Sequence, residues 1–287
     1  MRLSKDTGAL TGRYDYKTAI KMIQDAGFDA FDFSFMDKPD EKNNVLGADY
    51  LEKAHDLKAY IDALGIPCNQ AHAQTIFTHH DAMDESNEKY LQMVRSLEVA
   101  SVLGAENIIV HPVASALSAE NLDYLDYSRE YYRSLIPYCE KFNIHISVEN
   151  MFSVKDRKIV GIEGYETPQQ HIDYVKSLES EWFNICLDVG HCAVLGTEPE
   201  DAIGMMDNKL LKSLHIHDNN RRADQHLIPY LGTIHWDKVM EALKKIDYQG
   251  DLTFESCFFY FEMPDEMLPT ALKLAEEAGR SLIKQFK

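Results

Sequence analysis

The segments NIIVHPV (107–113), HISVEN (145–150) and LKSLHIHD (211–218) decide the predicted fold. Each is a short apolar run that carries a histidine, an acid or an amide at or near its end. Runs of this kind alternate along the chain with longer segments of helical period, which is the pattern of a parallel sheet with crossover helices. We therefore predict eight strand–helix units that close into an α/β fold, the (β/α)8 TIM barrel.

The remaining predicted elements follow the same alternation. The other strands are expected within residues 2–9, 28–35, 68–73, 183–191 and 251–256. The helices are expected near residues 15–26, 49–64, 86–103, 121–142, 168–178, 199–207, 236–245 and 267–284. Gly27, Gly65, Gly104 and Gly250 stand where a left-handed helix cap is expected before the next strand. An open doubly wound sheet would share the alternation, but no glycine-rich phosphate loop follows the first strand.

Length and composition suit one barrel domain over residues 1–287. The chain has 47 acidic against 29 basic residues, a formal net charge of -18, and such a field disfavours a nucleic-acid partner. There is neither an apolar stretch of membrane-spanning length nor a secretory signal peptide, so we expect a cytoplasmic protein, with a homo-oligomer left open. The five cysteines are scattered, which argues against a disulfide frame or a thiolate zinc site.

Polar side chains stand at the ends of six consecutive predicted strands, where barrel enzymes build their active sites. They are His72, His111, Glu149 with Asn150, Asp188 with His191, His215 with His217 and Asp218, and Glu255; the loop after the seventh strand adds Asp224 and His226. A lone strand-end histidine is usually a structural residue. A buried carboxylate costs several kcal/mol unless a cation or hydrogen bonds compensate its charge. One metal centre explains the six strand ends together.

The kind of metal follows from the kind of ligand. Mixed carboxylate and imidazole donors without thiolate suit Zn²⁺, Mn²⁺, Co²⁺ or Fe²⁺. Cys192 directly follows His191, but neighbouring side chains on a strand point to opposite faces, so we interpret Cys192 as a packing residue.

At these positions the sequence resembles the xylose isomerase-like barrel superfamily. The resemblance spans nearly the whole chain and is most specific at VEN (148–150), LDVGH (187–191), HIHDN (215–219), ADQH (223–226) and FES (254–256). In the branch of sugar isomerases and epimerases, the resemblance implies one divalent ion held by Glu149, Asp188, His215 and Glu255.

The resemblance also implies roles for individual residues. Glu149 and Glu255 would act as acid and base on opposite faces of a bound ketose, moving a proton next to its carbonyl. His191, Arg221 and His217 would contact oxygens of the sugar or sugar phosphate. The alternative readings are a loop hydrogen bond for His191 and a solvated surface charge for Arg221.

A second branch of the superfamily, the endonuclease IV class of apurinic-site nucleases, holds three zinc ions with a larger ligand set. This chain matches that set at His72, His111, Glu149, Asp188, His191, His215, Asp224, His226 and Glu255. The number of ions is therefore left open between one and three, and an apurinic-site phosphodiesterase is the alternative to a sugar isomerase or epimerase.

The predicted rim loops favour the sugar enzyme. The loops after the second and third strands carry more acid than base, whereas a DNA-binding rim needs Arg or Lys for phosphate contact. The loop after the fifth strand reads as a cover over a small polar ligand. Five aromatic residues are candidates for walls around a sugar ring or, equally, for ordinary packing: Phe77, Phe152, Tyr165, Trp236 and Phe258.

Overall fold

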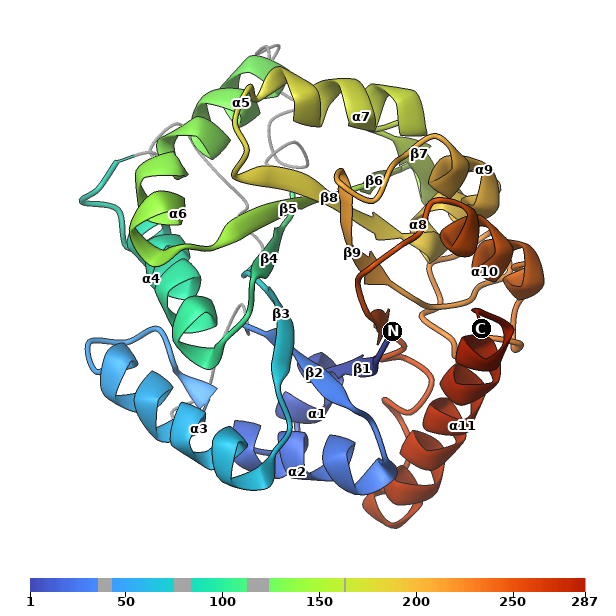
Figure 1. Cartoon of the computed structure of the whole chain (residues 1–287), viewed down its shortest axis with the longest axis horizontal. Helices are drawn as coiled ribbons and strands as arrows, with labels where there is room; N and C mark the ends of the chain where they lie inside the picture. The colour runs from blue at the N-terminus through green and yellow to red at the C-terminus, as the bar shows by residue number, and fades with distance from the viewer. Residues whose placement is uncertain (36–42, 75–83, 113–123, 163, 287) are drawn as a thin grey trace.

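A computed structural model of the chain describes all residues except 36–42, 75–83, 113–123, 163 and 287. Within these described ranges, eight parallel strands form a nearly closed ring with helices outside it, which confirms the predicted (β/α)8 barrel (Figure 1). The ring strands are β1 (Leu3–Asp6), β2 (Ala30–Ser34), β3 (Cys68–His72), β4 (Asn107–Val110), β5 (His145–Glu149), β8 (Phe183–Asp188), β9 (Leu211–His215) and β10 (Leu252–Phe254).

Neighbouring strands of the ring pair in parallel in the order β10-β1-β2-β3-β4-β5-β8-β9. The ring closes between β9 and β10 through Ile216, whose amide donates to the Thr253 carbonyl at 2.8 Å and whose carbonyl accepts from the Glu255 amide at 3.1 Å. This closure brings His215 and Glu255 to the same end of the barrel, together with the ends of the other strands.

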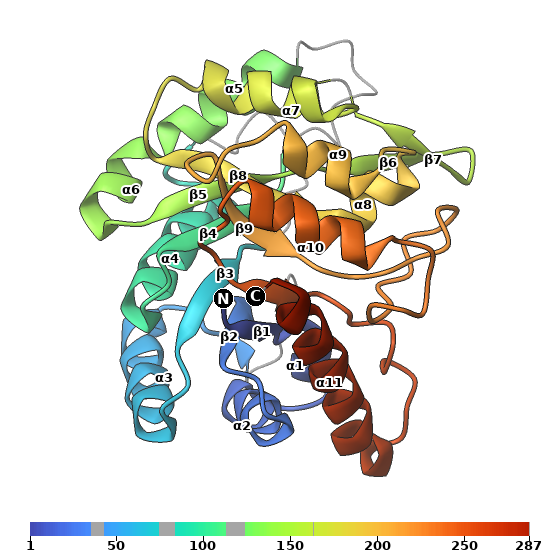
Figure 2. The same ribbon diagram turned by 45° about the vertical axis from the view of Figure 1, so that its right-hand side comes forward.

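Helices cover the outside of the ring (Figure 2). They are α1 (Gly8–Thr11), α2 (Tyr16–Ala26), α3 (Tyr50–Leu64), α4 (Glu88–Leu103), α5 (Tyr124–Ser134), α6 (Ile136–Phe142), α7 (Pro168–Ser177), α8 (Val189–Val194), α9 (Pro199–Gly204), α10 (Trp236–Lys245) and α11 (Leu268–Phe286), with the 3₁₀ turn η4 (Asp265–Met267) before α11. No helix in this described part of the chain is both long and apolar enough to cross a membrane.

Three of the four predicted glycine caps are confirmed. Gly27, Gly65 and Gly104 end α2, α3 and α4 with φ of 104°, 73° and 97°, a left-handed conformation that glycine adopts without strain. The prediction for Gly250 is wrong: α10 ends earlier, with Ile246 as its cap. Gly250 instead passes so close to Tyr248 that a Cβ would lie 2.2 Å from the phenol oxygen.

Two further predictions differ from the structure. The described part of the helix expected over 121–142 is broken into α5 and α6, because Pro137 lies in the first turn of α6 and has no amide hydrogen to continue α5. The loop after β5, which was predicted to be a cover, contains an antiparallel hairpin of β6 (Phe152–Lys155) and β7 (Lys158–Gly161). Its turn residues Asp156 and Arg157 have φ of 51° and 63°, as a tight hairpin turn requires.

Candidate metal centre

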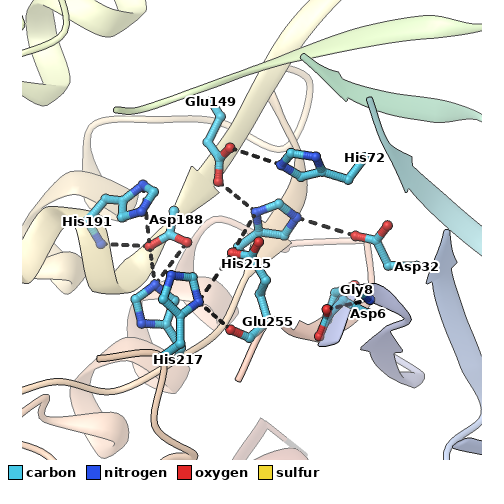
Figure 3. Close-up of polar contacts among 12 residues, drawn as sticks. Asp6, Gly8, Asp32, His72, Glu149, Asp188, His191, His215, His217 and Glu255 are labelled. Carbon is cyan, nitrogen blue, oxygen red and sulfur yellow. Dashed lines mark hydrogen bonds and ion pairs between the residues drawn. The ribbon is translucent and has the colours of Figure 1, made fainter. Parts of the chain in front are cut away.

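Four predicted ligands converge at the carboxyl ends of the strands, and we call them the central group. They are Glu149 at the end of β5, Asp188 at the end of β8, His215 at the end of β9 and Glu255 directly after β10. One potential ligand atom from each lies within 4.8 Å of the other three. His215 Nδ1 lies 2.6 Å from Glu149 Oε1 and 3.4 Å from Glu255 Oε2, so this nitrogen stands between the two glutamates (Figure 3).

Two histidines adjoin the central group on the side of Glu149. The Nε2 atoms of His72 and His111 lie 3.0 Å apart. Glu149 Oε2 lies 2.8 Å from His111 Nε2 and 3.6 Å from His72 Nε2. Glu149 therefore faces the histidine pair with one oxygen and His215 with the other, so it is a potential ligand in both groups.

A second cluster, which we call the loop group, consists of His191, His217, Asp224 and His226. His226 Nε2 lies 2.8 Å from Asp224 Oδ2, and the His217 and His226 rings stack with centroids 4.0 Å apart. His217 Nε2 also lies 3.0 Å from Asp188 Oδ1, which connects the loop group to the central group (Figure 3). The resemblance implies substrate contact for His217, which lies here among potential ligands together with His191, and the substrate contact stays a prediction.

The start of α8 positions Asp188 and His191. The strand predicted over 183–191 ends at Asp188, whose carboxylate accepts a hydrogen bond from the His191 amide at 2.6 Å and so caps the helix. Asn150 holds both residues: its side chain bonds the Asp188 amide at 2.7 Å, and its carbonyl lies 2.8 Å from His191 Nδ1. The strand argument for Cys192 was thus wrong, although Cys192 does pack in the core.

Glycine is required at position 190, in the first turn of α8. A Cβ there would lie 1.8 Å from the His217 ring, a distance that real contacts do not show. The missing side chain lets the His217 ring approach Asp188 and the helix start.

Asp218 follows His217 but is no free ligand. Its oxygens accept hydrogen bonds from the Asn219, Tyr230 and Ile234 amides and from Trp236 Nε1, at 2.8 to 3.2 Å. With these donors Asp218 anchors both ends of the loop that carries Asp224 and His226.

The electrostatics of the centre balance acids against imidazoles. Burial alone would raise the pKa of the Glu149 carboxyl, but His215 and His111 outweigh it and hold the pKa well below its usual value. Burial likewise lowers the pKa of His72, yet the hydrogen bond and charge of Glu149 raise it to about 9. His191 follows the same pattern beside Asp188, with a pKa of about 10.

The residues fit divalent cations. Two buried potential ligand atoms have no hydrogen-bond partner within the described structure: Asp224 Oδ1 and His217 Nδ1. A cation would satisfy such atoms and would take the place of the protons on the imidazoles. The donors are oxygen and nitrogen, as Zn²⁺, Mn²⁺, Co²⁺ and Fe²⁺ accept. Cys186 lies beside Glu149 and His215, but burial raises the pKa of its thiol to about 12 and keeps it from being a thiolate.

A cavity of about 250 Å³ opens beside these ligands. Its lining includes His72 and Glu255, together with Asp6, Ser34 and the exposed ring of Phe258. A small polar molecule in this cavity would touch Glu255 directly.

Other predicted contacts are placed differently. The Arg221 guanidinium is paired with Glu198 at 2.7 and 2.8 Å, so any substrate contact would require it to leave this partner. Tyr165 and Trp236 are buried in the core. Phe152 and Phe258 lie with ring centroids 5.0 Å from those of His191 and His226 respectively. Phe77 and most of the loop after β3 lie outside the described residues.

Sequence reasoning missed two acids near the centre. Asp32 in β2 is fully buried with Oδ2 3.3 Å from His215 Nε2, and Asp6 at the end of β1 lines the cavity. The signal for Asp32 was present in FDAFDFSF (28–35), where an acid alternates with aromatic residues inside a run predicted as a strand.

Known proteins share part of this sequence. The chain is 30% identical over 165 residues to an uncharacterized protein of Methanocaldococcus jannaschii, covering 56% of this chain and 54% of that protein. It is 34% identical over 95 residues to a D-psicose 3-epimerase of Enterocloster bolteae, covering 32% and 30% of the two chains. The matches to these two relatives span about half of the first and less than a third of the second.

Solved structures share the whole fold at low identity. A D-tagatose 3-epimerase-like protein matches with TM-score 0.71 and 20% identity over 100% of both chains. The IolI protein with a bound zinc atom matches with TM-score 0.75 and 18% identity, over 100% of this chain and 99% of that one. The model of the xylose isomerase-like TIM barrel family matches residues 20–279. The chain is a member of the xylose isomerase-like TIM barrel family.

Proposed function

We propose that this protein is a metal-dependent sugar isomerase or epimerase that moves a proton next to a carbonyl group. The proposal rests on one observation: carboxylate oxygens of two glutamates lie close to the same nitrogen of His215. Glu149 Oε1 lies 2.6 Å and Glu255 Oε2 lies 3.4 Å from His215 Nδ1. The sugar epimerases among the relatives and structural neighbours support the substrate class.

The central group would hold the ion, with Glu149, Asp188, His215 and Glu255 as ligands. A divalent ion bound there would act as a Lewis acid that polarises the sugar carbonyl and stabilises the charge that develops on its oxygen. Zinc, manganese, cobalt and iron all suit these donors, and the zinc in the IolI structure supports zinc among them.

The two glutamates would divide the proton transfer. Glu149 is buried and ionised, so it can accept a proton from a carbon held against it. Glu255 lines the cavity and has a side chain that is 20% exposed, so it can return a proton from the other side and exchange it with water. His191 and Arg221 remain proposed contacts of the substrate oxygens.

Isotope exchange tests this proposal. The zinc- or manganese-loaded protein is incubated with D-fructose, D-tagatose or D-psicose, and with their phosphate esters, in D₂O. NMR should show deuterium entering the carbon next to the carbonyl with at least one of these sugars, and chelator-treated protein should show none. No exchange with any ketose or aldose, although the metal is bound, would contradict the proposal.

The number of ions is a separate prediction. The histidine pair with Glu149, the central group and the loop group each offer three or four ligand atoms within 4.8 Å. We expect purified protein to retain between one and three divalent ions by elemental analysis. Absence of any ion, with turnover unaffected by a chelator, would remove the premise of the site.

A zinc-dependent apurinic-site phosphodiesterase is the second candidate, and the three adjoining ligand groups favour it. Clustered ions can generate a hydroxide and stabilise the leaving oxygen of a phosphodiester. The net charge of -18 opposes binding to DNA. Cleavage of a duplex with an abasic site, without isotope exchange into sugars, would decide for this candidate.

A further inference from the structure

The barrel interior contains a hydrogen-bonded row of polar side chains, where such barrels usually pack branched apolar residues. Ser4 donates to Asn69 at 2.6 Å, and Asn69 donates to Thr253 at 3.1 Å. Thr253 donates to the Gln70 side-chain oxygen at 3.3 Å, and Gln70 Nε2 donates to Asp32 Oδ2 at 2.8 Å. We call this row the interior column; it runs between β1, β3, β10 and β2.

The column ends on the metal centre. Asp32 Oδ2 lies 3.3 Å from His215 Nε2, and both side chains are fully buried (Figure 3). Asp32 Oδ1 has no hydrogen-bond partner in the described structure. A carboxylate buried this deeply costs several kcal/mol unless its charge is compensated, and the imidazole of His215 is the titratable group that it contacts.

The two nitrogens of His215 face different surroundings. Nδ1 points to Glu149 and Glu255, where the ion would lie, and Nε2 points to Asp32. A histidine that binds a metal through one nitrogen usually donates a hydrogen bond from the other, and this second bond fixes which nitrogen is free to ligate.

We infer that Asp32 is a positioning residue for the metal: it accepts the hydrogen bond of His215 Nε2–H and thereby presents Nδ1 to a divalent ion. Gln70 and the rest of the interior column hold Asp32 in the orientation that this requires. The inference rests on the proposed metal centre, but it concerns metal binding and holds whether the substrate is a sugar or a phosphodiester.

The wild-type protein provides the first test. In zinc-loaded protein with ¹⁵N-labelled histidine, NMR should show His215 ligated through Nδ1 and protonated at Nε2. Ligation through Nε2, or an Nε2 that carries no proton, would overturn the inference without any variant.

The second test is the Asp32→Asn variant. An asparagine keeps the shape but can turn its NH₂ group toward Nε2, which favours the other tautomer. We expect 10- to 100-fold weaker zinc binding in a chelator competition, the usual cost of losing such an outer partner. Asp32→Glu, which restores a carboxylate, should recover part of the affinity and the Nε2–H signal.

A matched control separates this role from ordinary packing. Asn107→Ala removes an interior hydrogen bond to Asn184 of 2.8 Å that touches no ligand. It should lower the unfolding temperature but leave zinc affinity and the His215 signals unchanged. Equal zinc affinity in wild type and Asp32→Asn would refute the positioning role. Isotope exchange into sugars is measured separately, so an inactive protein with the expected zinc and NMR results would refute only the proposed function.

Discussion

The central group and the loop group differ in what holds them. Three potential ligands of the central group are strand residues, and Glu255 directly follows β10 with its amide bonded to Ile216, so the barrel hydrogen bonds fix them. In the loop group His191 lies on the short helix α8, and the other three residues lie in the segment after β9.

The loop group depends instead on buried polar anchors. Asp218 bonds both ends of the loop, and Asn150 bonds the start of α8. Gly190 leaves the space that the His217 ring occupies. A few side chains outside the ligand set thus position the residues of the loop group, whereas strand pairing positions those of the central group.

This difference predicts which of the two groups keeps its structure when a neighbouring residue is substituted. Loss of the Asp218 anchor should disturb the loop group and leave the central group formed, because the residues of the central group share the barrel backbone. Loss of a central ligand should remove the chemistry but leave both scaffolds in place.

The largest effect is expected for Glu149→Gln and Glu255→Gln. Each removes a proposed acid–base carboxylate and a ligand, and loss of one such group costs about 10²- to 10⁴-fold in rate. Isotope exchange should fall at least that far, while circular dichroism keeps its wild-type form. Glu98→Gln, which changes a carboxylate bonded to Tyr50 on the helical layer, is the control and should stay within twofold. Near-normal exchange in either site variant would sink the acid–base assignment.

Asp218→Asn should have the next largest effect. The amide keeps the shape but places NH₂ hydrogens against two of the four donors that now bind Asp218, at a cost of about 3 kcal/mol in the free energy of unfolding. Urea unfolding measures this cost, and elemental analysis should show fewer bound ions than in the wild type, without loss of every ion.

Asp251→Asn is the matched control for that variant. Asp251 pairs with the half-exposed Arg2 at the far end of the barrel, so the loss should be within about 1 kcal/mol. If the two variants lost equal free energy of unfolding, or if Asp218→Asn lost all bound metal, the proposed difference between the central group and the loop group would be wrong.

The same difference explains what the sequence could predict. Strand ends are readable, because an apolar run followed by an acid or histidine marks one edge of the barrel; Glu149, Asp188, His215 and Glu255 were found in this way. The partner of Arg221 was not predictable, because Glu198 lies 23 residues away in sequence. The role of His217 depends on a gap left by Gly190, which no spacing rule reveals.

Asp32 shows what the sequence could not predict inside a strand. Its place inside FDAFDFSF was predicted to lie on a strand, but Asp32 was not predicted as a site residue, because its partner His215 stands 183 residues later in the chain. Pattern reading places a residue on a strand, whereas the contact of two side chains inside the barrel depends on ring closure and register.

The last expected effect depends on pH and concerns His171, which supports β5 from α7. His171 on α7 is buried, with Nε2 3.1 Å from the Val148 carbonyl and Nδ1 without a partner in the described structure. Burial lowers the pKa of His171 to about 4. The unfolded chain binds this proton below about pH 6.5 and the folded chain only below about pH 4. Stability from the neutral ring is therefore present above pH 6.5 and is lost as the pH falls toward 4.

The loss can reach about 3 kcal/mol at full acidification, since each pKa unit is worth about 1.4 kcal/mol. Urea unfolding of wild type and His171→Gln at pH 7, 5.5 and 4.5 measures it; the glutamine can still donate to Val148 but does not titrate. The stability of the variant relative to wild type should rise as the pH falls. If the difference in the free energy of unfolding between wild type and His171→Gln stayed constant with pH, β5 would not depend on a neutral His171. Any disruption of the central group by acid would then have to begin with protonation of its own residues.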